Sequence, residues 1–398
     1  MAMKTGVQAI RGGAGSGEEA GPMQPVTDDP GEGGRPSPET PGDRLILSLI
    51  QRHADATRSD LTKASCLTQQ SVSRIVDRLV RRDLVGIGSS VRNGRGQPSP
   101  IIRINPDAAF SLGLSVTADG VALTALDLAG GVIAEDISTI DSPTPADVIV
   151  LIRRFIAARA AQGLDTARLA GLGIGITGYF VGDGSQVNPP ALDDWAFVEL
   201  DRIFRDALHM PVWVENDGTA AAVGESLLGY GREVDDFAYL HFATGFGGGM
   251  IRNGQPMRGV NGNAGEFGGM LPPEYLSPSL GNLMRMVNDA EGLSYRTLRQ
   301  FLADFELDWA GVSAWLEQAG RSLTMIVNGI HAAVDPGMIV LGGRLPEALA
   351  APLIDRIRLY SPERRGFQRK APELRFAASP RDPVAIGAAT LPLRALYF

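Results

Sequence analysis

The chain of 398 residues contains one cysteine, Cys66, and four histidines that are far apart in the sequence. A single cysteine excludes an intrachain disulfide and is typical of the reducing cytoplasm, where we expect this protein to reside. Scattered histidines supply no group of ligands, which argues against a structural zinc site. No apolar run is long enough to span a bilayer, and the N-terminus lacks the pattern of a secretory signal. The sequence therefore predicts a protein that is neither integral to a membrane nor exported.

The composition changes twice along the chain. Residues 1–42 are rich in glycine, proline and acidic residues and show no hydrophobic periodicity, so we expect a disordered tail. Residues 43–108 predict a small helical domain with a pair of strands, whereas residues 109–398 alternate between strand and helix patterns. The sequence thus predicts an α/β protein with a small N-terminal domain and a large C-terminal domain.

The segment 58–85 predicts a short helix, a tight turn and a longer amphipathic helix. Ser59 is placed to cap the first helix and Thr68 the second, because a hydroxyl oxygen accepts from the free N–H groups of a first helical turn. Apolar residues recur at helical spacing on one face of the second helix. Its opposite face carries Gln70, Arg74, Asp77 and Arg81. This pattern is typical of a helix-turn-helix whose second helix enters the major groove.

A wing follows these helices. Leu84–Ile87 and Ile101–Ile104 predict two strands, and the loop between them carries Arg92 and Arg95. Residues 43–103 contain eleven Lys or Arg against five Asp or Glu, a net charge of +6, although the whole chain carries −8. A cationic module on an acidic protein suits attraction to phosphate. We therefore predict a winged helix-turn-helix that binds double-stranded DNA.

Side chains in the first two turns of the second helix are the candidates for reading bases, because glutamine pairs with adenine and arginine with guanine in the major groove. These candidates are Gln69, Gln70, Ser73 and Arg74. Arg92 and Arg95 are expected to contact phosphate or the minor groove. The alternative is a helical hairpin that only packs or mediates protein contacts.

The region from residue 109 onward predicts two sets of strands and helices, and hence two lobes with a cleft between them. Strands are expected at 111–118, 121–126, 132–137, 170–176, 211–215, 237–242, 250–252 and 338–341, and helices at 145–161, 217–228 and 319–334. Three motifs and a late strand then occur in a recognisable order. They are VENDGTAAAVGE (214–225), ATGFGGGMIRNG (243–254), GNAGEFGG (262–269) and IVLGG (339–343).

With these motifs behind a winged helix, the chain from residue 43 onward resembles the ROK family of repressors and sugar kinases. The resemblance implies an actin-like, two-lobed ATPase fold, with hinges near residues 217 and 380. Asp217 stands where the catalytic base of the family's kinases stands, so the resemblance implies that it contacts a sugar hydroxyl; helix capping also explains an aspartate there. Asn216 is a second sugar candidate and Asn188 a weaker one. Glu266 matches the family's sugar-binding glutamate, with a solvated loop carboxylate as the alternative.

The phosphate side departs from the family pattern. ROK kinases begin the domain with an Asp-x-Gly-Gly-Thr turn whose aspartate organises Mg²⁺, but the matching stretch here is Ser115–Ala118. That stretch lacks the carboxylate, and it lacks the glycines that let a backbone approach phosphate. A remnant of the second phosphate loop persists. It consists of Thr244, Gly245, Gly247 and Gly248, which packing alone can also maintain.

Most family members also bind zinc through a histidine that follows the AGE motif and a nearby cysteine cluster. Gly269 stands at the histidine position, and residues 270–292 contain no cysteine. We therefore expect no metal and no cofactor.

The sequence as a whole predicts a transcriptional regulator, a repressor whose large domain senses a sugar or sugar derivative and alters operator binding. The resemblance and palindromic operators favour a homodimer or homotetramer. Two alternatives remain open at this point. One is an ATP-dependent sugar kinase that carries a DNA-binding module, in which Asp217 would be catalytic. The other is a DNA-binding dimer that responds to no ligand.

Overall fold

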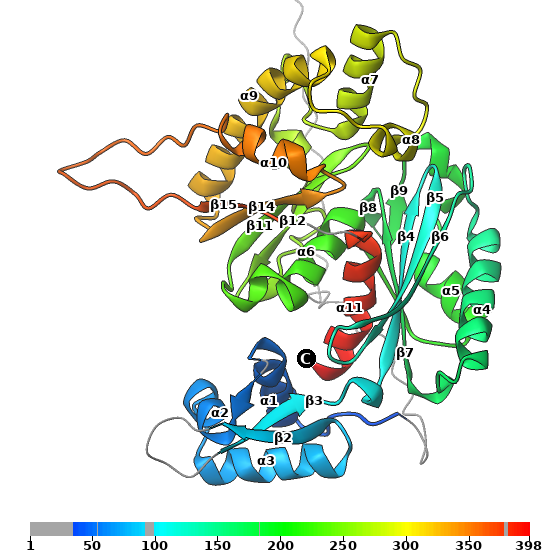
Figure 1. The fold of residues 1–398 in the computed structure, drawn as a ribbon, viewed down its shortest axis with the longest axis vertical. Helices are drawn as coiled ribbons and strands as arrows, with labels where there is room; N and C mark the ends of the chain where they lie inside the picture. The colour runs from blue at the N-terminus through cyan, green and yellow to red at the C-terminus, as the bar shows by residue number, and fades with distance from the viewer. Residues whose placement is uncertain (1–34, 54, 92–98, 183, 378–380) are drawn as a thin grey trace, which may run out of the picture.

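The computed structural model describes residues 35–53, 55–91, 99–182, 184–377 and 381–398. Figure 1 shows a small N-terminal module below two larger lobes, and a long C-terminal helix between them. The predicted disordered tail lies outside the described residues as far as residue 34. Within the described ranges, no helix is both long and apolar enough to cross a membrane.

The N-terminal module is a winged helix-turn-helix. Its elements are α1 (Pro41–Arg52), β1 (Ala56–Thr57), α2 (Arg58–Ser65), α3 (Gln69–Arg81), β2 (Val85–Val91) and β3 (Ser99–Ile104). The three strands form a sheet in the order β1-β3-β2. Apolar side chains of all three helices, among them Ile46, Leu61 and Val76, are fully buried in one core. That core continues into the large domain through Leu393 and Tyr397 of the C-terminal helix.

Two predictions for this module were wrong. Thr57, not Ser59, caps α2, because the Thr57 side chain accepts from the Asp60 N–H while the Asp60 carboxylate accepts from the Thr57 N–H. The module also begins before residue 43. Helix α1 starts at Pro41, and Thr40 caps it in the same reciprocal way with Asp43. The prediction that Thr68 caps α3 is confirmed, since its side chain accepts from the Ser71 N–H at 3.2 Å.

The first lobe is a five-stranded sheet with the order β10-β7-β4-β5-β6. Its elements are β4 (Phe110–Thr117), β5 (Gly120–Asp127), β6 (Val132–Ser138), α4 (Pro145–Ala161), β7 (Leu169–Ile176), the small hairpin β8 (Tyr179–Gly182) and β9 (Ser185–Val187), α5 (Leu200–Leu208) and β10 (Val212–Asn216). Strands β4, β7 and β10 are parallel, whereas β4, β5 and β6 form an antiparallel meander. Helices α4 and α5 contribute to the core on one face of this sheet.

The second lobe has its own five-stranded sheet, in the order β13-β12-β11-β14-β15. Its elements are α6 (Asp217–Leu228), β11 (Phe237–Phe242), β12 (Phe246–Arg252), β13 (Gln255–Pro256), α7 (Leu280–Glu291), α8 (Leu298–Ala303), α9 (Ala310–Ala333), β14 (Met338–Gly343), α10 (Glu347–Ile354) and β15 (Glu373–Phe376). Helix α9 begins nine residues before the predicted start at 319. Residues of α7, α9 and α10 bury one face of the sheet in the largest core of the protein.

The two lobes meet at a pair of helices. After β15 the chain returns to the first lobe as α11 (Pro383–Tyr397), which packs on β4 and β7, while α6 packs on β11 and β12. Glycines let the backbones approach closely. A Cβ on Gly224 of α6 would lie 2.7 Å from Gly387 Cα of α11, and one on Gly173 of β7 would lie 1.8 Å from the Ala388 carbonyl oxygen. The chain passes between the two sheets at the starts of α6 and α11.

Helix α1 joins the winged module to both lobes. The Gln51 side chain donates to the Ala129 carbonyl of the first lobe at 3.1 Å. Arg52, the next residue, pairs with Asp235 of the second lobe at 2.6 Å. At the other end of the helix, Arg44 donates to the Ala395 carbonyl of α11 at 2.8 Å. A single helix is therefore attached to each lobe and to the helix that links them.

Candidate functional site

The polar face of α3 is free of the module's core. Gln69, Gln70 and Arg74 are exposed and Ser73 is half-buried, while Val72 on the opposite face is fully buried. All four polar residues lie in the first two turns of the helix, as the sequence predicts. Arg92 and Arg95 lie outside the described residues. The described part of the module thus presents one row of hydrogen-bonding side chains to solvent.

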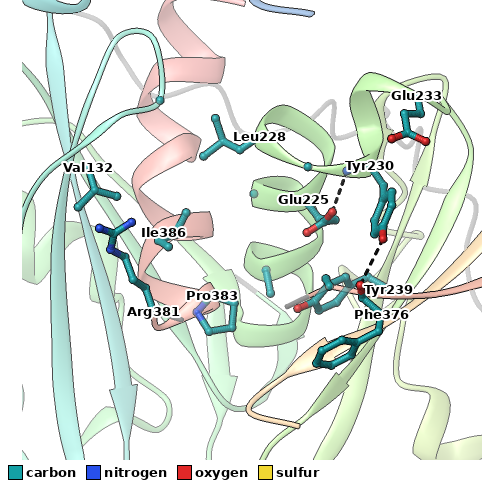
Figure 2. Close-up of a pocket in the computed structure, with 15 residues that line it drawn as sticks. Val132, Glu225, Leu228, Tyr230, Glu233, Tyr239, Phe376, Arg381, Pro383 and Ile386 are labelled. Carbon is teal, nitrogen blue, oxygen red and sulfur yellow. Dashed lines mark hydrogen bonds between the residues drawn. The ribbon is translucent and has the colours of Figure 1, made fainter. Parts of the chain in front are cut away.

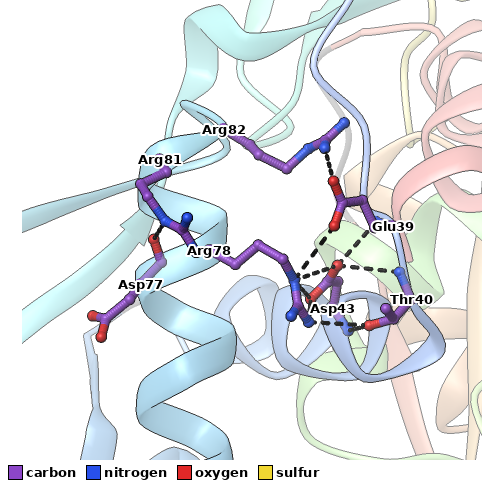
Figure 3. Close-up of polar contacts among 7 residues, drawn as sticks. All are labelled: Glu39, Thr40, Asp43, Asp77, Arg78, Arg81 and Arg82. Carbon is purple, nitrogen blue, oxygen red and sulfur yellow. Dashed lines mark hydrogen bonds and ion pairs between the residues drawn. The ribbon is translucent and has the colours of Figure 1, made fainter.

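The other side of α3 is held against α1 by a buried ion pair (Figure 3). The Arg78 Nε donates to the two Asp43 carboxylate oxygens at 3.0 and 3.2 Å, and the guanidinium also reaches the Thr40 hydroxyl. The Asp43 side chain has no exposed surface. Burial alone would raise the pKa of Asp43, but the bonds from Arg78 and from the backbone N–H groups of Glu39 and Thr40 hold it below its ordinary value. This pair fixes the angle between α1 and α3.

In the large domain, the candidate sugar residues converge on one turn, at Thr177 and Gly178 after β7. The Thr177 hydroxyl donates to Asp217 Oδ2 at 2.5 Å, and the Asn188 amide donates to the Thr177 carbonyl at 2.7 Å. The Asn216 amide donates to the Gly178 carbonyl at 2.8 Å. Side chains from two separate segments, Asn188 and the adjacent Asn216 and Asp217, therefore meet at the carboxyl end of one strand.

The structure separates the roles of Asn216 and Asp217. Asn216 is the N-cap of α6, since its Oδ1 accepts from the Gly218 and Thr219 N–H groups. Helix capping was the alternative explanation for Asp217; the N-cap is its neighbour, although Asp217 Oδ1 also accepts from the Gly218 N–H at 2.8 Å. Because both polar ends of the Asn216 side chain have internal partners, this residue holds the site in place. The Asp217 carboxylate is left beside the cavity described below.

Asn188 and Glu266 complete the predicted set. Asn188 is buried, and within the described residues its Oδ1 has no hydrogen-bond partner. Glu266 is exposed in the loop before the short helical turn Phe267–Met270. Dehydration at the cleft and the nearby Asp217 charge both raise the pKa of Glu266. The negative charge of Asp217 is thus close enough to disfavour ionisation of Glu266.

A cavity of about 170 Å³ lies between the lobes at the amino ends of α6 and α11. Ser115–Ala118 of the first lobe line it, together with Thr244 and Gly245 of the second. Gly247 and Gly248 do not line it. They belong to β12 and pair with β11, and a Cβ on Gly248 would lie 2.0 Å from the Tyr239 carbonyl oxygen. Packing therefore explains the glycine at 248, whereas Thr244 and Gly245 face the cleft.

The further residues that line this cavity include three titratable side chains that the sequence did not single out as site residues: His241, Arg344 and Asp382. His241 Nε2 lies 4.0 Å from Asp217 Oδ2, and its Nδ1 has no partner within the described residues. Burial lowers the pKa of His241, although the Asp217 and Asp382 carboxylates act in the opposite direction. The imidazole is therefore neutral at neutral pH and can both donate to and accept from a ligand hydroxyl.

A model of the ROK family matches residues 111–394. The chain belongs to the ROK family. A model of the MarR family matches residues 40–96, which contain the winged module. The predicted fold, a winged helix-turn-helix before a two-lobed actin-like ROK domain, is confirmed.

Relatives of this ROK protein include the Sinorhizobium fredii protein y4fQ, 29% identical over 79% of this chain and 81% of that protein. The Bacillus subtilis xylose repressor is 28% identical over 57% of this chain, and the match spans 59% of the repressor. The Brucella suis bifunctional enzyme NanE/NanK is 31% identical over 56% of this chain and 43% of the enzyme. The ROK family relatives thus include both a repressor and an enzyme.

Two solved structures share the fold. A ROK family transcriptional regulator, homologous to the Escherichia coli Mlc protein, superposes with a TM-score of 0.66 at 19% identity and covers 89% of this chain and 96% of its own. A Streptomyces griseus ROK glucokinase, solved with glucose and AMPPNP, gives a TM-score of 0.58 at 21% identity over 71% of this chain and 99% of its own. At these identities the likeness is one of fold.

The ROK domain of this chain does not fit a Mg²⁺-nucleotide at its first phosphate turn. Ser115 is buried where the family's kinases have aspartate. The carboxylate nearest along the turn, Asp119, accepts from the Thr117 hydroxyl at 3.0 Å and lies 4.0 Å from Arg344 Nη1. A guanidinium beside that carboxylate competes with a metal ion for its charge.

Proposed function

We propose that this ROK protein is a transcriptional repressor that binds operator DNA through α3 and a sugar through the cleft between its lobes. The observation that carries the proposal is the combination of two features in one chain. The module presents an exposed row of amide and guanidinium groups, and the ROK domain keeps Asp217 while it lacks the first phosphate carboxylate. The similarity to proteins named xylose repressor supports the same function.

Asp217 is the centre of the proposed sugar site. Its carboxylate is an acceptor for a sugar hydroxyl, with the neutral His241 imidazole 4.0 Å away and Glu266 nearby. Asn188 has a buried oxygen that finds no partner among the described residues, and a ligand hydroxyl can satisfy it. Because phosphoryl transfer needs Mg²⁺ on the nucleotide phosphates, loss of the carboxylate at Ser115 favours a site that binds without turnover.

Helix α1 supplies the proposed route from sugar to DNA. Gln51 and Arg52 attach this helix to different lobes, and Arg78 attaches α3 to α1. A sugar that binds one lobe angle more tightly than another therefore changes the position of α3. In a homodimer or homotetramer, that movement alters the spacing of two recognition helices relative to operator half-sites.

The proposal is tested by fluorescence anisotropy of the full chain on DNA from upstream of its own gene, against excess competitor DNA at near-physiological salt. Selective binding, followed by release with one member of a pentose and hexose panel, is the expected result. Binding that no sugar affects would support the ligand-independent alternative. Purely non-specific binding to that DNA and to a randomised site library would reject the DNA-reading function.

Arg74→Ala is expected to weaken binding to the preferred sequence by about 1–3 kcal/mol, roughly 5- to 150-fold, and to relax its sequence preference. The reason is that Arg74 is an exposed guanidinium within the first two turns of α3. Anisotropy on the preferred site and on single-base variants measures both effects. Arg285→Ala on α7 of the second lobe, which removes the same charge from an exposed helix, should leave both unchanged. Unchanged preference in Arg74→Ala would disprove the recognition-helix assignment.

Asp217→Asn is expected to raise the sugar concentration needed for DNA release by about 10- to 100-fold, because hydrogen bonds to a charged acceptor contribute about 1.5–3 kcal/mol. The affinity for DNA without sugar should stay within about twofold, since Asp217 belongs to α6 of the large domain, which Figure 1 shows apart from α3. The sugar dose response in the anisotropy assay measures the change. Asp289→Asn, on the exposed face of α7, is the matched control. An unaltered dose response in Asp217→Asn would place the sugar elsewhere.

No ATP turnover is expected with any member of the sugar panel. Ser115 supplies no metal ligand, and Arg344 lies beside Asp119. A coupled assay of ADP release with Mg²⁺ and ATP measures this, with a bacterial glucokinase as the positive control. Sugar-dependent turnover that disappears in Asp217→Asn would instead establish the kinase alternative.

A further inference from the structure

A second and larger cavity, of about 550 Å³, lies on the side of the lobe junction that is nearer the winged module. The C-terminal half of α6 and the first turns of α11 form two of its walls (Figure 2). The turn between β5 and β6 and strands β11 and β15 close the remainder. Its volume is in the range of small-molecule sites. Pro383, at the start of α11, borders both this cavity and the cleft cavity.

The second-lobe wall of this cavity is acidic. Glu225 of α6 is half-buried, and its Oε1 accepts from the Tyr230 N–H at 2.7 Å. Burial raises the pKa of Glu225, with the Tyr230 N–H acting in the opposite direction. No cation lies within ion-pair distance of this carboxylate among the residues that the structure describes. Glu233 adds an exposed carboxylate at the rim.

The floor of the cavity is aromatic. Tyr230, Tyr239 and Phe376 line it, and the Tyr230 hydroxyl donates to the Phe376 carbonyl at 3.3 Å. The Tyr239 hydroxyl accepts from the Gly343 N–H at 2.7 Å, so its polar end is already used. Aromatic rings beside a partly dehydrated carboxylate attract organic cations through both charge and the ring quadrupole.

The arginine on the first-lobe wall of the cavity does not remove this preference for an organic cation. Arg381 lines it, but its guanidinium is paired with Glu135 at 2.8 Å. Figure 2 places Arg381 beside Val132, on the far side of the cavity from Glu225 and Tyr230. The Arg381–Glu135 pair therefore carries no net charge. On the opposite wall, the charge next to a bound ligand is the negative charge of Glu225.

We propose that this cavity binds a small organic cation, a primary amine on an apolar body, with the ammonium group at Glu225 and the apolar body over the aromatic floor. The cavity also borders the two segments of the large domain that bond to α1. Gly130 borders the cavity next to Ala129, the acceptor of Gln51, and Glu233 borders it next to Arg232, whose carbonyl accepts from Arg52 at 3.3 Å. An amine here thus contacts both segments that hold the winged module.

The test titrates benzylamine and its neutral isostere benzyl alcohol into the full chain by isothermal calorimetry near pH 7.5. Benzylamine should bind about tenfold or more tightly than benzyl alcohol, which is the usual size of a charge-assisted contact. Glu225→Gln keeps the side-chain shape and should remove that difference. Glu274→Gln, an exposed carboxylate of the second lobe outside the cavity, should retain it. Equal binding of the two probes, an unchanged difference in Glu225→Gln, or no benzylamine binding would each overturn the proposal.

Hydrogen exchange on the unaltered protein guards against a variant that merely misfolds. Benzylamine should slow amide exchange in residues 225–233 and in residues 51–53, while benzyl alcohol should not. Protection confined to other regions would place the amine elsewhere and overturn the assignment. Neither measurement uses DNA or a sugar, so failure of this site is distinguishable from failure of the repressor proposal.

Discussion

Arg78→Met is expected to destabilise the winged module by about 3–5 kcal/mol, because removal of one partner leaves a buried charge unpaired. Asp43 has no exposed surface, and Arg78 supplies most of its side-chain hydrogen bonds (Figure 3). Methionine keeps the apolar length of arginine but cannot donate. Hydrogen exchange of the α1 and α3 amides measures the module by itself, which avoids treating a multidomain chain as two-state.

Arg81→Met is the matched control, since Arg81 is exposed on the same helix and bonds only to the Asp77 carbonyl within the described residues. It should change stability by no more than about 0.5 kcal/mol. Acidity provides a second check. The pKa of Asp43 is depressed in the folded state, so the stabilisation is present above the unfolded pKa and is lost as the pH falls through the folded pKa. The difference between Arg78→Met and the original chain should therefore shrink in acid. A constant difference would mean that packing, not charge, is responsible.

Gly173→Val should prevent the first lobe from folding and leave little soluble protein. A Cβ at this position would lie 1.8 Å from the Ala388 carbonyl oxygen, and the atom that blocks it belongs to the backbone of α11. A flexible side chain could move aside, whereas a helix backbone cannot without opening the interface with β4 and β7. A cost above about 4 kcal/mol is expected from this mechanism. Soluble yield and cooperative thermal unfolding measure it.

Gly86→Val is the corresponding control on an exposed strand. A Cβ at Gly86 meets no atom within 4 Å, and valine favours strands, so normal yield is expected. Soluble, cooperatively unfolding Gly173→Val protein would show that α11 can lift from the sheet, and the account of the lobe junction would then be wrong.

The sequence predicted the elements whose pattern is local. Helices 145–161 and 217–228 were predicted at their observed bounds, because a capping threonine or asparagine and an apolar periodicity both lie within the segment. The start of α2 was misassigned although Thr57 and Asp60 spell a capping box, because Ser59 was equally acceptable by residue type alone. Helices α1, α5, α7, α8, α10 and α11 were not predicted; they lie outside the motifs that carry the family resemblance.

The cleft was predicted only in part, for a physical reason. Asp217 and Glu266 sit inside motifs, whereas His241 precedes the glycine loop and Arg344 follows the IVLGG strand, so adjacency to a motif was their only signal. Asp382, which caps α11, lies near the second hinge that the family resemblance implies, but the residues around it do not show that it lines the same cavity as Asp217. The proposed ligand role of Asp217 and the capping role of Asn216 could not be separated from the sequence either, because both side chains bond to the Thr177–Gly178 turn, which follows another strand, β7.

The position of α11 has a consequence for how this protein is made. Residues 383–397 are synthesised after the strands of both sheets, yet they cover the sheet formed by β4 and β7 and accept the hydrogen bond from Arg44 of α1. Domains generally form in order of synthesis, so the winged module can fold while the nascent chain still lacks its anchor. A premature stop codon shortly before α11 would therefore yield a folded winged module attached to a first lobe whose sheet lacks the helix that covers β4 and β7. Such a truncated product would bear the apolar face that α11 normally covers and would be a target for chaperones and proteases.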